Sequence, residues 1–177
     1  MQVGLTSAGV LALLDPSSSE LPMLMIQRHR GLRAHPGQIG LPGGSQEQGD
    51  GSLWQTALRE ALEEVAVPPT AVLPLGYANP VQVQHTGFLI APVVATLRHP
   101  FVPALSLAEV EAYFWMPLRD RSGQVEIVQR RVATRLGVFE VPGYLFEGHF
   151  VWGATGMIVD DLRRRLGEPV AGPPEFP

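Results

Sequence analysis

The chain has no cysteine and no lysine. Without cysteine, disulfide bonds, thiolate nucleophiles and cysteine-ligated zinc are excluded. All thirteen basic residues are arginine, so a side-chain cation that binds phosphate must be Arg or His. No run of about 18 apolar residues is present, so we expect no transmembrane helix. The first residues have no basic segment ahead of a long apolar stretch, so we expect no signal peptide and a cytoplasmic protein.

Charged residues are also scarce, at 17% of the chain, with a formal net charge of −4. A mildly acidic chain has no general attraction to nucleic acid or to an anionic membrane, so we predict neither as a partner. Apolar residues make up 45% of the 177 residues, which suits one domain with a sizeable core. We predict a single domain over residues 1–166 and a loose tail over 167–177. The composition leaves a homodimer open.

Nineteen glycines and seventeen prolines divide the chain into short segments. Ser52 and Gln55 form a capping-box signature, and Pro68 and Pro69 stop the helix that follows. A mixed sheet packed between helices, an α/β/α sandwich of the α+β class, fits the order of these segments. The pattern predicts strands over 8–15, 21–28, 123–133 and 136–142, more strands within 71–97, a turn and a strand over 106–118, and helices over 52–66 and 152–166.

The stretch "LREALEEV", residues 58–65, places three glutamates beside one arginine. A helical wheel puts the predicted core face opposite an arc of glutamates. One interpretation is a solvated charged face with an Arg59–Glu63 ion pair, since like-charge neighbours cost only about 0.2–0.5 kcal/mol each. The core face comprises Trp54, Leu58, Ala61, Leu62 and Val65, and the opposite arc comprises Glu60, Glu63 and Glu64.

The alternative interpretation is a cation site. The turn "LPGG", residues 41–44, precedes the helix, and glycine permits close approach of other groups. Such a turn can offer a carbonyl oxygen beside the helix. Hard divalent cations such as Mg²⁺ prefer carboxylate and carbonyl oxygens and usually keep waters and substrate phosphates. A glycine turn followed by clustered carboxylates supplies that set of ligands.

The segment "GGSQEQGDGSLWQTALREALEEVAV", residues 43–67, resembles the Nudix box, G-x(5)-E-x(7)-R-E-U-x-E-E-x-G-U, where U is a bulky aliphatic residue. Asp50 stands at the first acidic position, and the spacer from it to Arg59 is one residue longer than in the pattern. Ala61 replaces the bulky aliphatic residue, and Ala66 replaces the late glycine. The matching residues are Gly44, Arg59, Glu60, Glu63 and Glu64.

The longer spacer and the upstream segment resemble the coenzyme A pyrophosphatase branch of the Nudix hydrolases. That branch carries the signature L-L-T-x(2)-R-S-x(3)-R-x(3)-G-x(3)-F-P-G-G, which "MLMIQRHRGLRAHPGQIGLPGG" follows in register. Leu24, Arg28, Arg33, Gly37, Pro42, Gly43 and Gly44 agree with the signature, and Met23, Met25, His29 and Leu41 depart from it.

The resemblance implies a Mg²⁺-dependent (or Mn²⁺-dependent) hydrolase of the pyrophosphate bond of coenzyme A or its derivatives. The products would be 3′,5′-ADP and 4′-phosphopantetheine. We predict Glu60 and Glu64 as metal ligands, because residues at i and i+4 share one helix face. Glu63 is a third ligand or, through a bound water, the general base. The carbonyl group of Gly43 or Gly44 completes the set of ligands.

Basic residues surround this predicted centre. Arg59 is expected to orient a carboxylate. Asp50 is either the other partner of Arg59 or a charge at the N-terminus of the helix. The phosphate groups of the substrate are expected to bind Arg28, Arg30, Arg33 and His35, since Arg suits bidentate phosphate contact. A solvated loop is the alternative for these four residues.

Some assignments stay open. Glu109 and Glu111 are outside candidates for the general base, and solvated loop positions are the alternative for both. Trp152 is either a core side chain or a platform for a base, and "RRR" at 163–165 is interpreted as a solvated face. Two other functions remain: hydrolysis of another nucleoside diphosphate derivative, such as ADP-ribose or NADH, and a non-catalytic module that binds a nucleotide.

Overall fold

The computed structural model describes residues 6–83, 87–134 and 137–173; expectations for positions outside these ranges are not addressed by it. The larger sheet contains β1 (Thr6–Leu14), β2 (Pro22–Arg28), β3 (Ile39–Gly40), β4 (Gly43–Ser45), β5 (Val72–Tyr77), β6 (Val81–Val83), β7 (Phe88–Leu97) and β8 (Val110–Pro117). The smaller sheet contains β9 (Glu126–Thr134), β10 (Gly137–Phe146) and β11 (His149–Trp152), and the α-helices are α1 (Leu53–Val65) and α2 (Gly153–Arg165).

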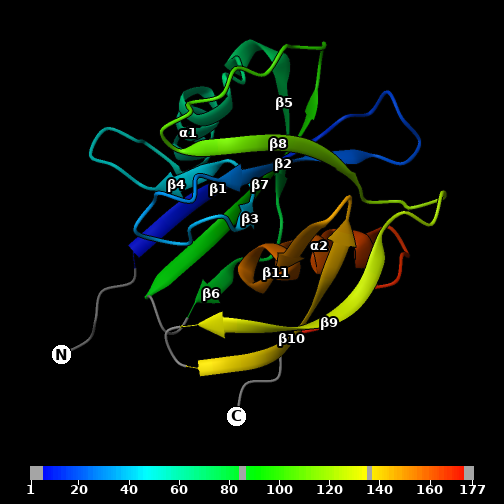
Figure 1. Cartoon of the computed structure of the whole chain (residues 1–177). Helices are drawn as coiled ribbons and strands as arrows, with labels where there is room; N and C mark the ends of the chain where they lie inside the picture. Colours follow the sequence, from blue (N-terminus) through cyan, green and yellow to red (C-terminus); the bar gives the residue numbers. More distant parts are fainter. Residues whose placement is uncertain (1–5, 84–86, 135–136, 174–177) are drawn as a thin grey trace.

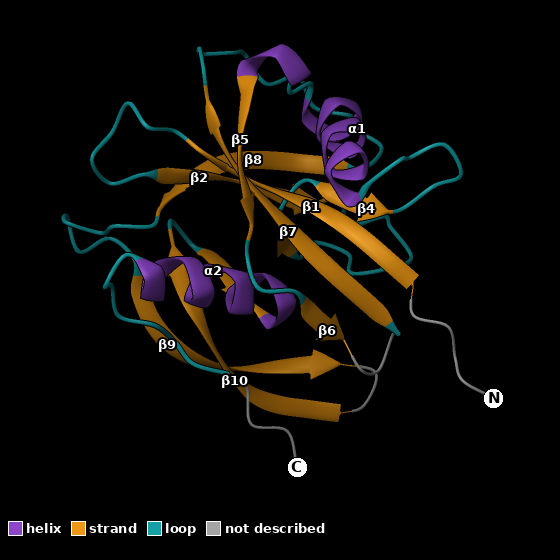
Figure 2. Cartoon of the chain, turned by 180° about the vertical axis from the view of Figure 1, so that it is seen from behind, coloured by secondary structure: helices purple, strands orange, loops and turns teal. Residues whose placement is uncertain are grey.

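The larger sheet is mixed. Its main strand order is β3-β2-β1-β7-β5, with β4 on β1, β6 on β7 and β8 on β2. β1 and β7 are parallel, and the other pairs in this sheet are antiparallel. Helix α1 lies on one face of the sheet, and α2 with the smaller sheet lies on the other (Figures 1 and 2). The predicted α+β class, with a mixed sheet between helices, is confirmed.

The central strands are apolar on both faces because both faces are covered. Leu11 and Leu13 of β1 pack in the cluster under α1, together with Ala57 and Ala61 of that helix. The alternate residues of β1 and β2, such as Met25, pack in a second cluster with α2 and the smaller sheet. This double burial explains why 8–15 and 21–28 are almost unbroken hydrophobic runs.

Helix α1 begins and ends close to the predicted residues. The Oγ of Ser52 accepts the N–H of Gln55 at 3.3 Å, and the Gln55 side chain accepts the N–H of Gly51 at 2.6 Å. The helix ends at Ala66, whose φ of 56° is left-handed. Left-handed backbone is where helix ends favour glycine, so the late glycine of the Nudix box has a structural reason. Ala66 adopts the same conformation despite its Cβ.

The predicted core face of α1 is wrong in two places. Leu62 is 47% exposed, whereas Glu64 is only 2% exposed. Seven residues of α-helix turn through about 20° less than two full turns, so Glu64 lies almost directly above the buried Ala57. The helix therefore turns Glu64 toward the sheet and leaves Leu62 at the solvent edge.

The segment after α2 is docked where it is described, so the prediction of a loose tail is wrong for residues 169–172. Arg163 donates hydrogen bonds to the carbonyls of Pro169 at 2.8 Å and Leu118 at 2.9 Å. The Asp160 carboxylate accepts the N–H of Gly172 at 3.0 Å and also bonds the Tyr144 hydroxyl. Arg163 is 3% exposed, so the "RRR" stretch is not a uniformly solvated face.

No helix in the described ranges combines the length and apolar character needed to cross a membrane.

Candidate active site

The glycine turn at 43–44 lies where β4 meets β1 and α1, and it sets the position of two carboxylates. The N–H of Gly43 donates a hydrogen bond to Glu64 Oε2 at 3.0 Å. A Cβ on Gly44 would collide with the Glu60 carboxylate, coming within 2.6 Å of its Cδ. Glycine at 44 therefore leaves the space that the Glu60 side chain occupies. The turn and two side chains from adjacent turns of α1 form one compact group.

Glu64 is the most buried member of the carboxylate cluster, which we define as Glu60, Glu63 and Glu64. Burial raises the pKa of Glu64 to about 7. The Gly43 N–H and the Arg28 guanidinium act in the opposite direction, while the charges of Glu60 and Glu109 raise this pKa further. A positive charge placed beside such a buried carboxylate stabilises its ionised form.

Arg59 links the other two members of the cluster. Its Nη1 lies 3.0 Å from Glu60 Oε1 and 3.1 Å from Glu63 Oε2. Burial raises the pKa of Glu60, against the effect of Arg59. The side chain of Glu63 is 55% exposed, whereas that of Glu60 is 15% exposed. The predicted Arg59–Glu63 ion pair is present, but Glu60 and Glu64 do not form a solvated face.

Asp50 holds Arg59 from the other side, which is the first of the two roles that the sequence left open for it. Arg59 Nε and Nη2 lie 3.2 and 3.1 Å from the two Asp50 carboxylate oxygens. Arg59 also lowers the pKa of Asp50 to about 2, with help from the N–H of Glu47. The Thr56 hydroxyl donates to Asp50 at 3.0 Å, a contact that sequence reasoning missed. Asp50 therefore fixes the plane of the guanidinium that contacts the cluster.

The four predicted phosphate-binding residues occupy different surroundings. Arg28 Nη1 lies 3.8 Å from Glu64 Oε1, and its Nε is buried with no hydrogen-bond partner in the described part of the chain. Arg30 pairs with Glu111 at 3.4 Å, and the ring of His35 contacts Gln38 at 3.0 Å. Arg33 is exposed. The structure thus brings Arg28 to the cluster and leaves the other three on the loop.

Glu109 enters the site more directly than the sequence indicated. Its carbonyl accepts the N–H of His29 at 2.7 Å, and the N–H of the nearby Ser106 donates to the Glu64 carbonyl at 2.9 Å. These bonds hold the 106–109 turn beside the end of α1. The charge of Glu109 raises the pKa of both Glu60 and Glu64. Glu111, the other outside candidate, is paired with Arg30.

The donor chemistry of the cluster fits a hard divalent cation. Glu60 and Glu64 are one turn apart, both have raised pKa values, and both lie against the glycine turn. Within the described ranges, however, no three Asp, Glu or His side chains already converge as a set of ligands. Arg59 holds Glu60 and Glu63 instead, so binding would require those side chains to turn toward the ion.

The candidate site thus consists of the carboxylate cluster of α1 against the glycine turn, on a mixed sheet between helices. The sequence model of the NUDIX domain matches residues 5–136. The chain therefore belongs to the Nudix family and is a Nudix hydrolase, a pyrophosphohydrolase. Members of this family typically depend on divalent metal ions.

Relatives and solved structures agree with this assignment. The protein named "Uncharacterized Nudix hydrolase NudL" from Citrobacter koseri is 37% identical over 150 residues, which is 82% of this chain and 75% of the relative. The C. elegans Ap4A hydrolase binary complex has a TM-score of 0.55 at 21% identity, covering 64% of this chain and 81% of that one. A MutT/nudix family protein from Enterococcus faecalis has a TM-score of 0.55 at 17% identity, covering 94% of this chain and 64% of that one. At these identities the two structures show the fold alone.

Gly44→Ala tests how closely the turn and Glu60 are matched. We expect turnover to fall about 100-fold, because displacing a reacting group by about 1 Å can cost that much. Stability should change little, since the colliding atoms are the end of a flexible side chain. Steady-state kinetics and thermal unfolding measure the two effects.

Gly40→Ala is the control for that variant, because a Cβ there would meet nothing within 4 Å. An active Gly44→Ala enzyme would show that Glu60 works equally well in another position.

Proposed function

We propose that the protein catalyses Mg²⁺-dependent hydrolysis of the pyrophosphate bond of coenzyme A or its derivatives. The products are 3′,5′-ADP and 4′-phosphopantetheine or its acyl form. The pyrophosphohydrolase class follows from the family, and the choice of substrate is the proposal. It is supported by the arginine signature upstream of the glycine turn and by the place of Arg28 beside Glu64.

The surroundings of Arg28 give the main support for coenzyme A as the substrate. Its Nε is buried and makes no hydrogen bond within the described residues, while its Nη1 is 3.8 Å from the cluster. A phosphate oxygen is a strong acceptor for such a donor. Arg33 lies on the same loop and is free to turn, since it is exposed. Coenzyme A carries a 3′-phosphate besides its diphosphate, which accounts for more cationic side chains than a diphosphate alone requires.

Glu60 and Glu64, with the carbonyl of Gly44, would hold a Mg²⁺ or Mn²⁺ ion, and Glu63 would be either a third ligand or the general base. When bound, the ion neutralises diphosphate charge and lowers the pKa of the attacking water. Arg59, fixed by Asp50, positions Glu60 and Glu63. Glu63 is exposed enough to take the proton of the water, and Glu109 is the second candidate for that step. Arg28 and Arg33 orient the phosphates.

Product analysis tests the proposal directly. We expect coenzyme A incubated with the enzyme and Mg²⁺ to yield 3′,5′-ADP and 4′-phosphopantetheine in equal amounts, measured by chromatography and mass spectrometry. Chelation of the metal should stop the reaction.

Rates on ADP-ribose and NADH complete this experiment. Turnover of either at an equal or higher kcat/KM would replace the coenzyme A assignment with another Nudix activity. Binding of all these nucleotides without any turnover would instead favour a non-catalytic module.

A further inference from the structure

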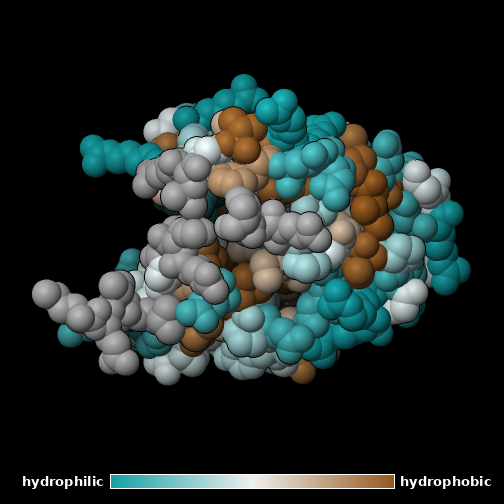
Figure 3. Space-filling view, turned by 90° about the horizontal axis from the view of Figure 1, so that it is seen from below, coloured by the Kyte–Doolittle hydropathy of each residue, from teal (hydrophilic) through white to brown (hydrophobic). Residues whose placement is uncertain are grey.

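A cavity of about 350 Å³ lies between the segment 36–39 and the smaller sheet. One wall comes from the end of β2 and the segment before β3, and the other comes from β9 and β11. Seen from below the view of Figure 1, the molecular surface carries hydrophobic patches among hydrophilic residues (Figure 3). The side chains that determine its chemistry are Gln27, Gln38, Val132, His149, Phe150 and Trp152.

The second wall presents aromatic rings held in place by the sheet. Phe150 and Trp152 are two residues apart on β11, so their side chains share one face. Gly143 on the neighbouring strand makes room for them, because a Cβ there would lie 2.6 Å from the Phe150 ring. His149, on the alternate face, stacks on Phe114 with ring centroids 4.2 Å apart and an interplanar angle of 8°. All three rings are only half-buried, which leaves surface for a planar ligand.

The charge around this cavity is suited to an anion. The guanidinium of Arg130 lies 5.3 Å from the centroid of the Phe150 ring. Val132, two residues further on the same strand, lines the cavity, so Arg130 shares that face of β9. No described residue of the lining is acidic. A ring with a cation beside it, in a described lining that contains no carboxylate, matches a base that carries phosphate.

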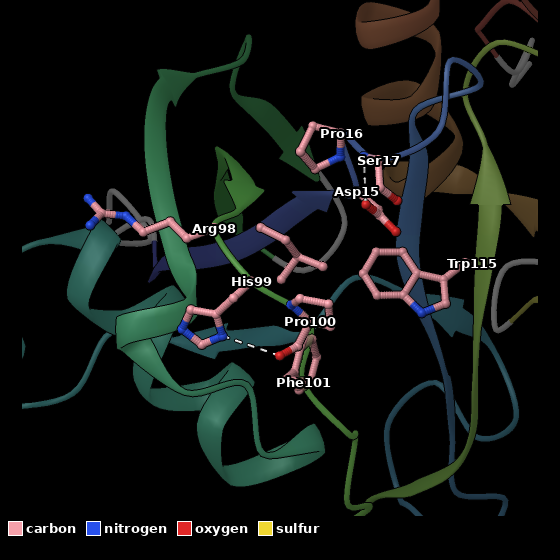
Figure 4. A pocket seen from close by; sticks show the side chains of 9 residues that line it. Asp15, Pro16, Ser17, Arg98, His99, Pro100, Phe101 and Trp115 are labelled. Carbon is pink, nitrogen blue, oxygen red and sulfur yellow. Dashed lines mark hydrogen bonds between the residues drawn. The ribbon is translucent and has the colours of Figure 1, made fainter.

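A second cavity, of about 360 Å³, lacks this combination. It lies at the carboxyl ends of β1 and β7, away from the glycine turn, and Asp15 contributes a carboxylate beside Trp115 (Figure 4). The Arg98 side chain points away from it, and the His99 ring contacts the carbonyl of Pro100 at 3.2 Å (Figure 4). Asp15 would repel a phosphate that entered this cavity.

The aromatic cavity is connected to the catalytic group through the backbone of Arg28. The N–H of Arg28 donates to the Gln38 carbonyl at 3.0 Å, and its carbonyl accepts the N–H of Gly37 at 3.1 Å. Gln27, the preceding residue, lines the cavity. The same residue thus reaches the carboxylate cluster with its side chain and supports the cavity wall with its main chain.

We propose that this cavity binds the nucleoside end of the substrate. The base stacks against Trp152, beside the Phe150 ring that Arg130 covers, and Arg130 pairs with a further phosphate on the ribose. This inference rests on the proposed function and locates the part of the site that selects a 3′-phosphorylated nucleotide over an ordinary one. Selection depends on Arg130, because a nucleotide without the additional phosphate makes only the stacking contacts.

Direct binding tests this assignment without any turnover. Adenosine 3′,5′-bisphosphate and adenosine 5′-monophosphate are titrated calorimetrically into the full-length protein without metal. We expect the bisphosphate to bind about 10-fold more tightly, and Arg130→Gln to remove that difference. Arg131→Gln is the matched control, since the next residue of β9 faces the opposite side of the sheet. Trp152→Leu should weaken both nucleotides at least 10-fold, since one stacked base contributes about 1–3 kcal/mol.

The outcomes separate this inference from the proposed function. Equal affinity of the wild-type protein for both nucleotides, or an unchanged preference in Arg130→Gln, would overturn the cavity assignment even if coenzyme A is hydrolysed. Loss of the preference in Arg130→Gln but not in Arg131→Gln would support it, even if coenzyme A were not a substrate. If Trp152→Leu fails to fold, Arg130→Gln alone decides.

Discussion

Glu64→Gln is expected to lower kcat by several orders of magnitude and leave the protein folded. Glutamine keeps the shape of the side chain, and its carbonyl oxygen can still accept the N–H of Gly43. The substitution removes the negative charge that a divalent cation requires at this buried position. Turnover of the preferred substrate at saturating Mg²⁺ measures the effect, and circular dichroism verifies the fold.

Glu47→Gln is the matched control for that substitution. Its carboxylate also lies within 4.0 Å of Arg59, but its side chain is 69% exposed and outside the cluster. We expect near-normal turnover from this variant. If Glu64→Gln kept comparable turnover, Glu64 would not be a metal ligand and the mechanism proposed above would fail.

Glu64→Gln should also reveal how much the burial of Glu64 destabilises the wild-type protein. Its pKa in the folded protein, about 7, lies above the ordinary value of 4.5. The folded state therefore binds this proton more tightly, and the wild-type free energy of unfolding loses this contribution as pH rises from 4.5 through 7. We expect the free energy of unfolding of metal-free Glu64→Gln, relative to that of the wild type, to rise by roughly 3 kcal/mol between pH 4.5 and pH 8. Denaturant titrations at the two pH values measure this difference, and an equal offset at both would contradict the raised pKa.

Local sequence patterns were sufficient for much of the fold. Ser52 and Gln55 predicted the start of α1, because capping depends on neighbours in the chain. The runs at 8–15 and 21–28 predicted buried strands, because strands covered on both faces need no polar alternation. The Asp50–Arg59 pairing was one of two roles left open for Asp50, and the structure contains it.

Features set by contacts distant in sequence could not be obtained in this way. The burial of Glu64 depends on Gly43 and Arg28, more than twenty residues earlier, so a wheel drawn for α1 alone misplaced Glu64 and Leu62. The docked tail depends on Asp160 and on Tyr144 of β10, since these buried groups bond main-chain amides. The proposed nucleoside cavity combines β2 with β11, and no local pattern relates those strands.

Gly9→Ala is the substitution that we expect to destabilise the protein most. Gly9 lies in β1 opposite Gly44, directly beneath the first turn of α1. A Cβ there would collide with the Leu53 carbonyl oxygen and come within 3.2 Å of the Ala57 nitrogen. These are backbone atoms, which no rotation of a side chain can move. The helix must therefore shift away from the strand, and we expect a loss of about 3 kcal/mol or more in the free energy of unfolding.

Gly156→Ala in α2 is the control, and we expect it to raise the free energy of unfolding instead of lowering it. Its nearest neighbour would be the Val151 carbonyl oxygen at 3.7 Å, an ordinary contact, and alanine favours helix over glycine by about 1 kcal/mol. Urea unfolding of both variants measures these values. Because α1 carries Glu60 and Glu64, the Gly9→Ala protein should also lose activity at temperatures where it remains folded. A Gly9→Ala protein as stable and active as wild type would show that α1 can dock without this close approach to β1.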